Sequence, residues 1–247
     1  MIRSLALIIK FIFFISISGC SPSYSALNHH NDELQTMNYT ERGQAVPTVY
    51  YTATVQRDQQ SCQKSQLIDL VDVRDKVLAQ LCKRDYDLCR IQGSCVIKDG
   101  PSIVKSLNFH TVKYGKTRFA ELDLKDCPFG YGVKNICLDP YYSIAADLNL
   151  YKTGDVIFIE KVKGAVLPNG QLHNGYFVVR DQGGGIDGFG RFDFFTGMDK
   201  PYSAKNTLSK LGLADPDNRF TYVKVTEDVA RIVRQKRIFP KTPEKSF

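Results

Sequence analysis

Short β-prone segments, separated by turns that contain Gly or Pro, limit how this chain can fold more than any other feature of its sequence. Residues 46–56 alternate and are rich in Val, Tyr and Thr, while residues 156–163, 176–180 and 220–225 are rich in β-branched and aromatic side chains. Such segments predict strands. The Pro-Asn-Gly sequence at 168–170 predicts a turn between two of them. Many short strands with few helices favour a mainly β protein built around a barrel.

One segment favours a helix instead. Residues 67–82 place apolar side chains at the spacing of a single helix face. These side chains are Leu67, Leu70, Val71, Val77, Leu78 and Leu81. We therefore expect a barrel formed by residues 46–61 and 96–247, interrupted by a cysteine-rich and partly helical insertion at residues 62–95.

The first 19 residues form an apolar leader that starts with the basic Arg3. The leader has the length of a secretory signal peptide and is too short to span a bilayer comfortably. Lys10 also interrupts its apolar sequence. It ends in Ile-Ser-Gly before Cys20, a sequence that resembles the lipobox of bacterial lipoproteins. The alternative is a plain secretory leader that is followed by a cysteine by chance.

The lipobox resemblance implies that Cys20 carries lipid and holds the protein at the bacterial cell envelope. Ser21, at the next position, is compatible with an outer-membrane protein that faces the periplasm. Residues 20–45 are rich in Ser, Asn, His and Gln and show no apolar period, which predicts a flexible tether between anchor and folded domain.

Six cysteines remain after Cys20, and an even number in an exported chain predicts up to three disulfides. They are Cys62, Cys82, Cys89, Cys95, Cys127 and Cys137. Six cysteines allow 15 pairings. Turn residues between Cys127 and Cys137 favour that pair, and the others stay open. The chain has no CxxC sequence and no histidine beside these cysteines, so we expect no zinc, no other metal and no cofactor.

The formal net charge of +7 is modest and spread along the chain. A nucleic-acid partner would require a run of Lys and Arg or an Arg-rich helix, and the sequence contains neither. We expect a monomer that does not bind nucleic acid.

Three aspartates follow or lie within apolar, β-prone sequence, where an unpaired charge is costly. Asp147 ends the sequence IAAD, Asp181 begins DQGGGIDG, and Asp193 lies within RFDFFTG. Aspartates in such places are either hydrogen-bonded posts that cap turns or members of a shared acidic site.

These three segments resemble the catalytic domain of the membrane-bound lytic transglycosylase A family, which also has three aspartates. The resemblance holds in order and spacing over residues 144–197 and extends to the strand at 50–55, whereas it is weak over residues 62–137. Asp187 is a departure, because the family usually has Lys at that position.

The resemblance implies a six-stranded double-psi β-barrel. It also implies an enzyme that cleaves the MurNAc–GlcNAc β-1,4 bond of peptidoglycan without water, leaving 1,6-anhydroMurNAc ends. Asp193 matches the catalytic position and would act first as acid and then as base. Asp181 and Asp147 would hold the site and raise the pKa of Asp193.

Further residues are expected to contact the glycan, again by resemblance: Thr54, Gly183, Gly184, Gly185 and Phe195. Phe192 and Phe194, with Phe195, would surround Asp193 with apolar bulk. Two alternatives stay open: a barrel lipoprotein that binds peptidoglycan or another polysaccharide without cleaving it, and a glycoside hydrolase on the same fold.

Overall fold

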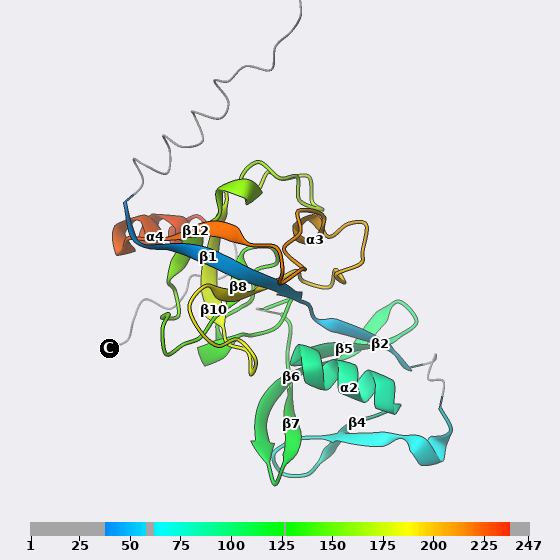
Figure 1. Cartoon of the computed structure of the whole chain (residues 1–247). Helices are drawn as coiled ribbons and strands as arrows, with labels where there is room; N and C mark the ends of the chain where they lie inside the picture. Colours follow the sequence, from blue (N-terminus) through cyan, green and yellow to red (C-terminus); the bar gives the residue numbers. More distant parts are fainter. Residues whose placement is uncertain (1–37, 58–61, 126, 238–247) are drawn as a thin grey trace, which may run out of the picture. The chain divides into compact units, whose positions relative to one another are not determined.

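A computed structural model describes residues 38–57, 62–125 and 127–237 of the chain (Figure 1). The expected leader, the lipidated Cys20 and the first part of the expected tether lie outside these described residues. The strands are β1 (Tyr39–Tyr50), β2 (Ala53–Gln56), β3 (Ile68–Val71), β4 (Val77–Leu81), β5 (Ser94–Asp99), β6 (Ser102–Lys113), β7 (Lys116–Glu121), β8 (Ser143–Ala145), β9 (Val156–Phe158), β10 (Tyr176–Asp181), β11 (Arg191–Phe195) and β12 (Phe220–Val225). The α-helices are α2 (Lys83–Gln92), α3 (Thr207–Lys210) and α4 (Glu227–Gln235), and the short 3₁₀ helices are Lys64–Gln66, Val133–Asn135 and Glu160–Val162. No helix in the described ranges has both the length and the apolar character needed to cross a membrane.

Six strands close into a barrel in the order β1-β11-β8-β10-β9-β12, which confirms the expected mainly β fold with a six-stranded barrel. Two of the pairs, β1 with β11 and β8 with β10, are parallel, and the others are antiparallel. The interior is filled by apolar side chains that strand alternation points inward. They include Ile144, Ile157, Phe177, Val179, Phe192, Phe194 and Tyr222.

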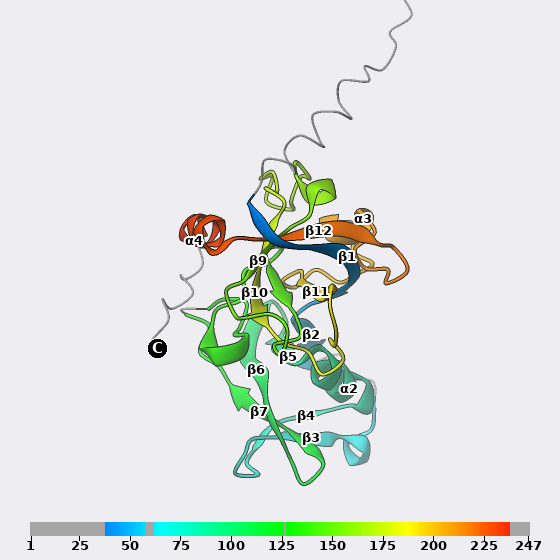
Figure 2. The same cartoon turned by 60° about the vertical axis from the view of Figure 1, so that its left-hand side comes forward.

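Strand β1 has two different partners along its length. Its first half pairs antiparallel with β12, whereas residues 46–50 pair parallel with β11. Figure 2 shows β1 and β12 side by side in the barrel wall. Near the start of β1, the carboxylate of Glu41 accepts hydrogen bonds from the hydroxyls of Tyr151 and Tyr222.

This strand corrects the expected boundary of the tether. Residues 39–45 belong to β1, so the folded domain begins before residue 46. The polar composition of this segment misleads because its backbone pairs with β12 and Ala45 is fully buried, while polar side chains such as Arg42 and Gln44 are exposed on the other face.

Downstream of β1, a second group of strands forms the insertion, and it is larger and less helical than expected. Strands β2, β5, β6 and β7 form a four-stranded sheet, and β3 pairs with β4 in a hairpin. These strands span Ala53 to Glu121, so the expected boundaries at residues 62–95 are wrong. The apolar cluster of this unit includes Val55, Leu70, Leu81, Cys89, Cys95, Leu107 and Phe119.

The helix expected at residues 67–82 is also wrong, because that segment is the β3–β4 hairpin. The carboxylate of Asp72 accepts hydrogen bonds from the backbone N–H groups of Arg74 and Lys76, at 2.8 and 2.9 Å, and closes the turn. Asp75 takes a positive φ of 64° in the same turn. Strand β3 buries Leu70 and strand β4 buries Leu78 and Leu81, and the spacing of these leucines in the sequence imitates a helix face.

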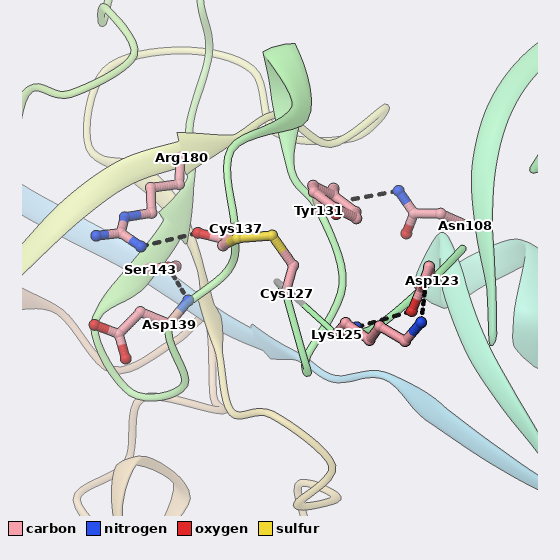
Figure 3. The surroundings of a disulfide bond; sticks show 9 residues. All are labelled: Asn108, Asp123, Lys125, Cys127, Tyr131, Cys137, Asp139, Ser143 and Arg180. Atoms are coloured by element: carbon pink, nitrogen blue, oxygen red, sulfur yellow. Dashed lines mark hydrogen bonds and ion pairs between the residues drawn. A yellow bond between two sulfur atoms is a disulfide. The ribbon is translucent and has the colours of Figure 1, made fainter. Parts of the chain in front are cut away.

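Three disulfides join Cys62 to Cys82, Cys89 to Cys95 and Cys127 to Cys137, and the last is the pair favoured from the sequence. Figure 3 shows the third disulfide and the contacts around it. The fully buried Arg180 donates a hydrogen bond of 2.8 Å to the carbonyl oxygen of Cys137. Asn108, from β6, donates one of 2.9 Å to the carbonyl oxygen of Tyr131. The disulfide loop thus contacts both a barrel strand and the four-stranded sheet.

The loop between β10 and β11 provides a test of the fold. Gly190 has a φ of +70°, and a Cβ atom there would lie 2.4 Å from the carbonyl oxygen of Gln44 in β1. We expect Gly190→Ala to lower the free energy of unfolding by roughly 2–4 kcal/mol, because strain and a backbone clash act together. Gly184→Ala is the matched control, since a Cβ there meets nothing within 4 Å. Urea unfolding measures both, and equal stability of the two variants would contradict this account of the loop.

Candidate active site

Two of the three aspartates lie on either side of one small residue. Strand β8 runs between β11 and β10, and its Ala145 is the register partner of both Asp193 and Asp181. Neighbouring strands lie about 4.8 Å apart, so the two aspartate backbones are separated by roughly 10 Å. The side chain between them is a single methyl group, and Ala145 is itself buried.

Strand β1 supplies a hydroxyl group to each of these aspartates. Thr48 pairs with Asp193 in the parallel ladder, and its hydroxyl donates a hydrogen bond of 2.7 Å to Asp193 Oδ1. Two residues later on the same face, the hydroxyl of Tyr50 donates one of 3.1 Å to Asp181 Oδ2. The backbone N–H of Gln182 donates to Asp181 Oδ1 at 2.9 Å. Both oxygens of Asp181 are therefore occupied.

Asp193 differs from Asp181 in keeping one oxygen free. No described residue donates a hydrogen bond to its Oδ2. Asp193 Oδ2 is also absent from the fully buried, unpaired side-chain atoms of the described residues, so this oxygen is accessible. Asp193 can carry a proton on Oδ2 without losing a hydrogen bond. Asp181 has a donor on each oxygen, so a proton on either one must share that oxygen with an existing hydrogen bond.

Burial raises the pKa of both carboxyl groups toward neutral pH. It raises the pKa of Asp181 to about 7, although hydrogen bonds from Gln182 and Tyr50 act in the opposite direction, and the charge of Asp193 raises it further. Burial also raises the pKa of Asp193 to about 6, against the lowering effects of the Thr48 hydroxyl and the Arg191 charge.

An apolar cluster contributes to this desolvation. It consists of Tyr50, Leu138, Ala145 and Phe195, with Phe129 packed against it. Phe195 is fully buried, and its ring centre lies 5.1 Å from that of Tyr50. Phe195 therefore offers no exposed face on which a sugar could stack, which argues against its expected role in substrate contact.

The other two phenylalanines do not surround Asp193 as expected. Side chains alternate along β11, and Phe192 and Phe194 point into the barrel core while Asp193 points out of it. Only Phe195 lies on the side of Asp193.

Asp147 has a different role from the other two aspartates. Its carboxylate accepts hydrogen bonds from the backbone N–H of Asn149 at 2.9 Å and of Gly188 at 3.0 Å. The hydrogen bond from Gly188 is the main reason that the pKa of Asp147 lies below its usual value. Asp147 is thus an ionised post that holds the loop between Asp181 and Asp193.

That loop contains the three glycines expected at the glycan. Gly184 and Gly185 are exposed and have open space where a Cβ would be, whereas a Cβ on Gly183 would lie 2.6 Å from the Ile186 side chain. Thr54 lies apart from this loop in the chain, on β2, where it pairs with Val96 in the four-stranded sheet. Contact of these residues with substrate stays a prediction.

Sequence reasoning did not single out Thr48, the hydroxyl of Tyr50 or Arg191. The available signal was the alternation in β1, which puts Thr48 and Tyr50 on one face. Their partners could not be named without the parallel register between β1 and β11. Within the described ranges, His, Cys, Asp and Glu form no group of three or more that could hold a metal ion.

Comparison with known proteins places the three aspartates within one matched family. The family model described as the 3D domain matches residues 142–207, which run from β8 to α3 and contain all three aspartates. Residues 142–207 form a 3D domain. No curated protein sequence matches the chain significantly.

Solved structures extend the likeness beyond the 3D domain. MltA from E. coli, in a crystal structure with bound chitohexaose, is 16% identical, and the match covers 74% of this chain and 72% of that one with a TM-score of 0.51. A membrane-bound lytic murein transglycosylase from Agrobacterium tumefaciens is 14% identical, with 78% and 76% covered and a TM-score of 0.46. The protein thus has an MltA-like fold around its 3D domain.

The raised pKa of Asp181 predicts a pH-dependent stability. The folded state binds the proton of Asp181 more tightly than the unfolded state, so this group makes the fold less stable as the pH rises from about 4 to about 7. Asp181→Asn should therefore raise the free energy of unfolding by roughly 1–3 kcal/mol at pH 8, with little gain at pH 4.

Thermal unfolding at the two pH values measures this effect. Asp187→Asn is the matched control, because Asp187 is exposed on the same loop. A gain for Asp181→Asn that is the same at both pH values, or that Asp187→Asn shares, would show that the burial of the Asp181 charge is not the cause.

Proposed function

We propose that this protein is a peptidoglycan lytic transglycosylase in which Asp193 alone serves as acid and base. The observation that carries the proposal is the pair of unequal carboxyl groups: Asp193 has a raised pKa and an open Oδ2, and Asp181 has both oxygens occupied. The pair lies on a 3D domain with an MltA-like fold, and the proteins that share this fold include a lytic murein transglycosylase.

The reaction needs only one protonated carboxyl group. Asp193 donates the Oδ2 proton to the glycosidic oxygen between MurNAc and GlcNAc while the bond from that oxygen to C1 of MurNAc breaks. The resulting Asp193 carboxylate accepts the proton of the MurNAc C6 hydroxyl as O6 attacks C1. The product is a 1,6-anhydroMurNAc end, Asp193 is protonated again, and no water is consumed.

Hydrolysis would require a second functional carboxyl group in this site. Glycosidases use two carboxyl groups, one as acid and the other as base or nucleophile. Asp181 is the neighbouring candidate, but Tyr50 and Gln182 already donate hydrogen bonds to its two oxygens. Asp193, whose Oδ2 accepts from no described residue, is the better candidate for the proton transfer.

The exposed backbone at Gly184 and Gly185 is where we place a glycan strand. Without side chains, these residues allow a sugar ring to approach the loop that joins Asp181 to Asp193. Thr54 and Gly183 complete the proposed substrate contacts.

Replacement of Asp193 tests the function. We expect Asp193→Asn to fold normally and to lower the release of 1,6-anhydro-muropeptides from purified sacculi by at least about a thousandfold, because amides do not transfer this proton. In the wild type, activity should fall as the pH rises through about 6, since the acid form of Asp193 is lost.

Mass spectrometry of the products checks each outcome. Asp187→Asn, which removes one negative charge from the exposed loop, is the control and should keep most of the activity. Products with reducing ends would assign the protein as a hydrolase, and glycan binding without any cleavage would make it a binding protein.

We further propose that lipid on Cys20 anchors the protein to the outer membrane, facing the periplasm. The support is the lipobox-like sequence before Cys20 and the apolar leader that precedes it. A lipidated cysteine carries a diacylglycerol, and two acyl chains are what stable membrane anchoring needs.

Replacement of this cysteine tests the anchor. Cys20→Ala should give a protein that is unprocessed or soluble, and that no longer fractionates with membranes as a mature lipoprotein. Cys62→Ala is the control for the loss of a cysteine, since Cys62 lies in the folded domain, disulfide-bonded to Cys82. Normal processing and membrane retention of Cys20→Ala would overturn the proposed anchor.

A further inference from the structure

Arg191 belongs to the same strand as Asp193 and reaches across to β1. Its Nη1 donates hydrogen bonds to the Thr48 hydroxyl at 2.9 Å, to the carbonyl oxygen of Val46 at 3.1 Å and to that of Phe192 at 3.3 Å. The Thr48 hydroxyl in turn lies 2.7 Å from Asp193 Oδ1. A continuous chain of hydrogen bonds thus runs from a guanidinium group through one hydroxyl to the carboxyl group of Asp193.

The donor and acceptor in each of these hydrogen bonds follow from the side chains involved. Arginine has donors and no acceptor, so the oxygen of Thr48 must be the acceptor in its bond with Arg191. A hydroxyl group has a single proton, and Asp193 Oδ1 is the one acceptor for it among the described residues. The proton of Thr48 therefore points at Oδ1, which must be an acceptor.

The same geometry decides where the proton of Asp193 itself lies. A proton on Oδ1 would require the Thr48 hydroxyl to turn and accept it, and the proton of Thr48 would then have no acceptor among the described residues, at a cost comparable to an unmade hydrogen bond. A proton on Oδ2 keeps all of the hydrogen bonds. We propose that Arg191 and Thr48 form a positioning relay that holds the acid proton of Asp193 on Oδ2, the oxygen open to substrate.

The proposal rests on the proposed function, because it concerns the acid of that reaction, but it has a readout that needs no activity. The charged and titratable groups around Asp193 are Arg191 on its own strand, Tyr50 on β1 and Asp181 on β10 across Ala145 of β8. Of these, Arg191 contacts the relay directly through Thr48, and Tyr50 contacts Asp181 instead.

Substitution of the hydroxyl group separates positioning from structure. Thr48→Val keeps the shape of the side chain and removes its donor, so Asp193 should titrate about half a unit to one unit higher. The kcat for 1,6-anhydro product should fall about tenfold while KM changes little, because the acid proton can then also occupy Oδ1, which does not face the substrate. Thr48→Ser should restore both quantities toward wild type.

Carbon NMR of the Asp193 side-chain carboxyl group follows the titration in the folded protein, with Asp193→Asn identifying the signal. The matched control is Thr40→Val on the same strand, because the Thr40 hydroxyl is exposed and donates to the carbonyl oxygen of Lys224. Arg191→Met should shift the titration in the same direction as Thr48→Val.

The outcomes distinguish the two proposals. A shifted titration without any glycan cleavage by the wild type would leave the relay intact and overturn the proposed function. If Thr48→Val titrates like Thr40→Val, or if Thr48→Ser behaves like Thr48→Val, the relay is wrong even in an active transglycosylase. Circular dichroism and melting temperature confirm that each variant is folded before it is compared.

Discussion

The double pairing of β1 is the interaction on which the barrel and its site depend. One half of the strand closes the barrel against β12, and the other half runs parallel to β11. The parallel register sets Thr48 opposite Asp193 and, two residues on, brings Tyr50 to Asp181. Without the pairing of β1 with β11, both carboxyl groups would lack these donors.

The three aspartates act on a single loop, each in its own way. Asp181 ends the strand before the loop, Asp193 lies in the strand after it, and Asp147 holds its middle through Gly188. The loop is also fixed near its end, where the N–H of Gly190 donates to the hydroxyl of a buried tyrosine. The chain can therefore return from one carboxyl group to the other along a defined path.

Much of this arrangement could be predicted from local sequence. The segments at 156–163, 176–180 and 220–225 do coincide with strands β9, β10 and β12 to within a few residues, because β-branched and aromatic residues are dense there. Spacing alone could also place Asp147, Asp181 and Asp193 in one region of the chain.

What failed depends on partners that are distant in sequence. The leucines of residues 67–82 fit a helix face equally well as they fit a hairpin, and the turn at Asp72 decides between them. Phe192 and Phe194 resemble an aromatic surround for Asp193 until alternation sends them into the core. The polar start of β1 reads as a linker unless β12, more than 170 residues away, is known to pair with it.

The place at which the chain enters the barrel has a mechanical consequence. The described domain begins with β1 almost at once, so tension applied to the chain ahead of Tyr39 acts along that strand and loads its ladder with β12 in shear. Side chains alternate with a period of two, so a slip of one residue would turn Thr48 and Tyr50 away from their carboxylates. The strand that would receive the force also carries the hydroxyl groups that bond to Asp193 and Asp181, so a shift of this strand would reach both carboxyl groups directly.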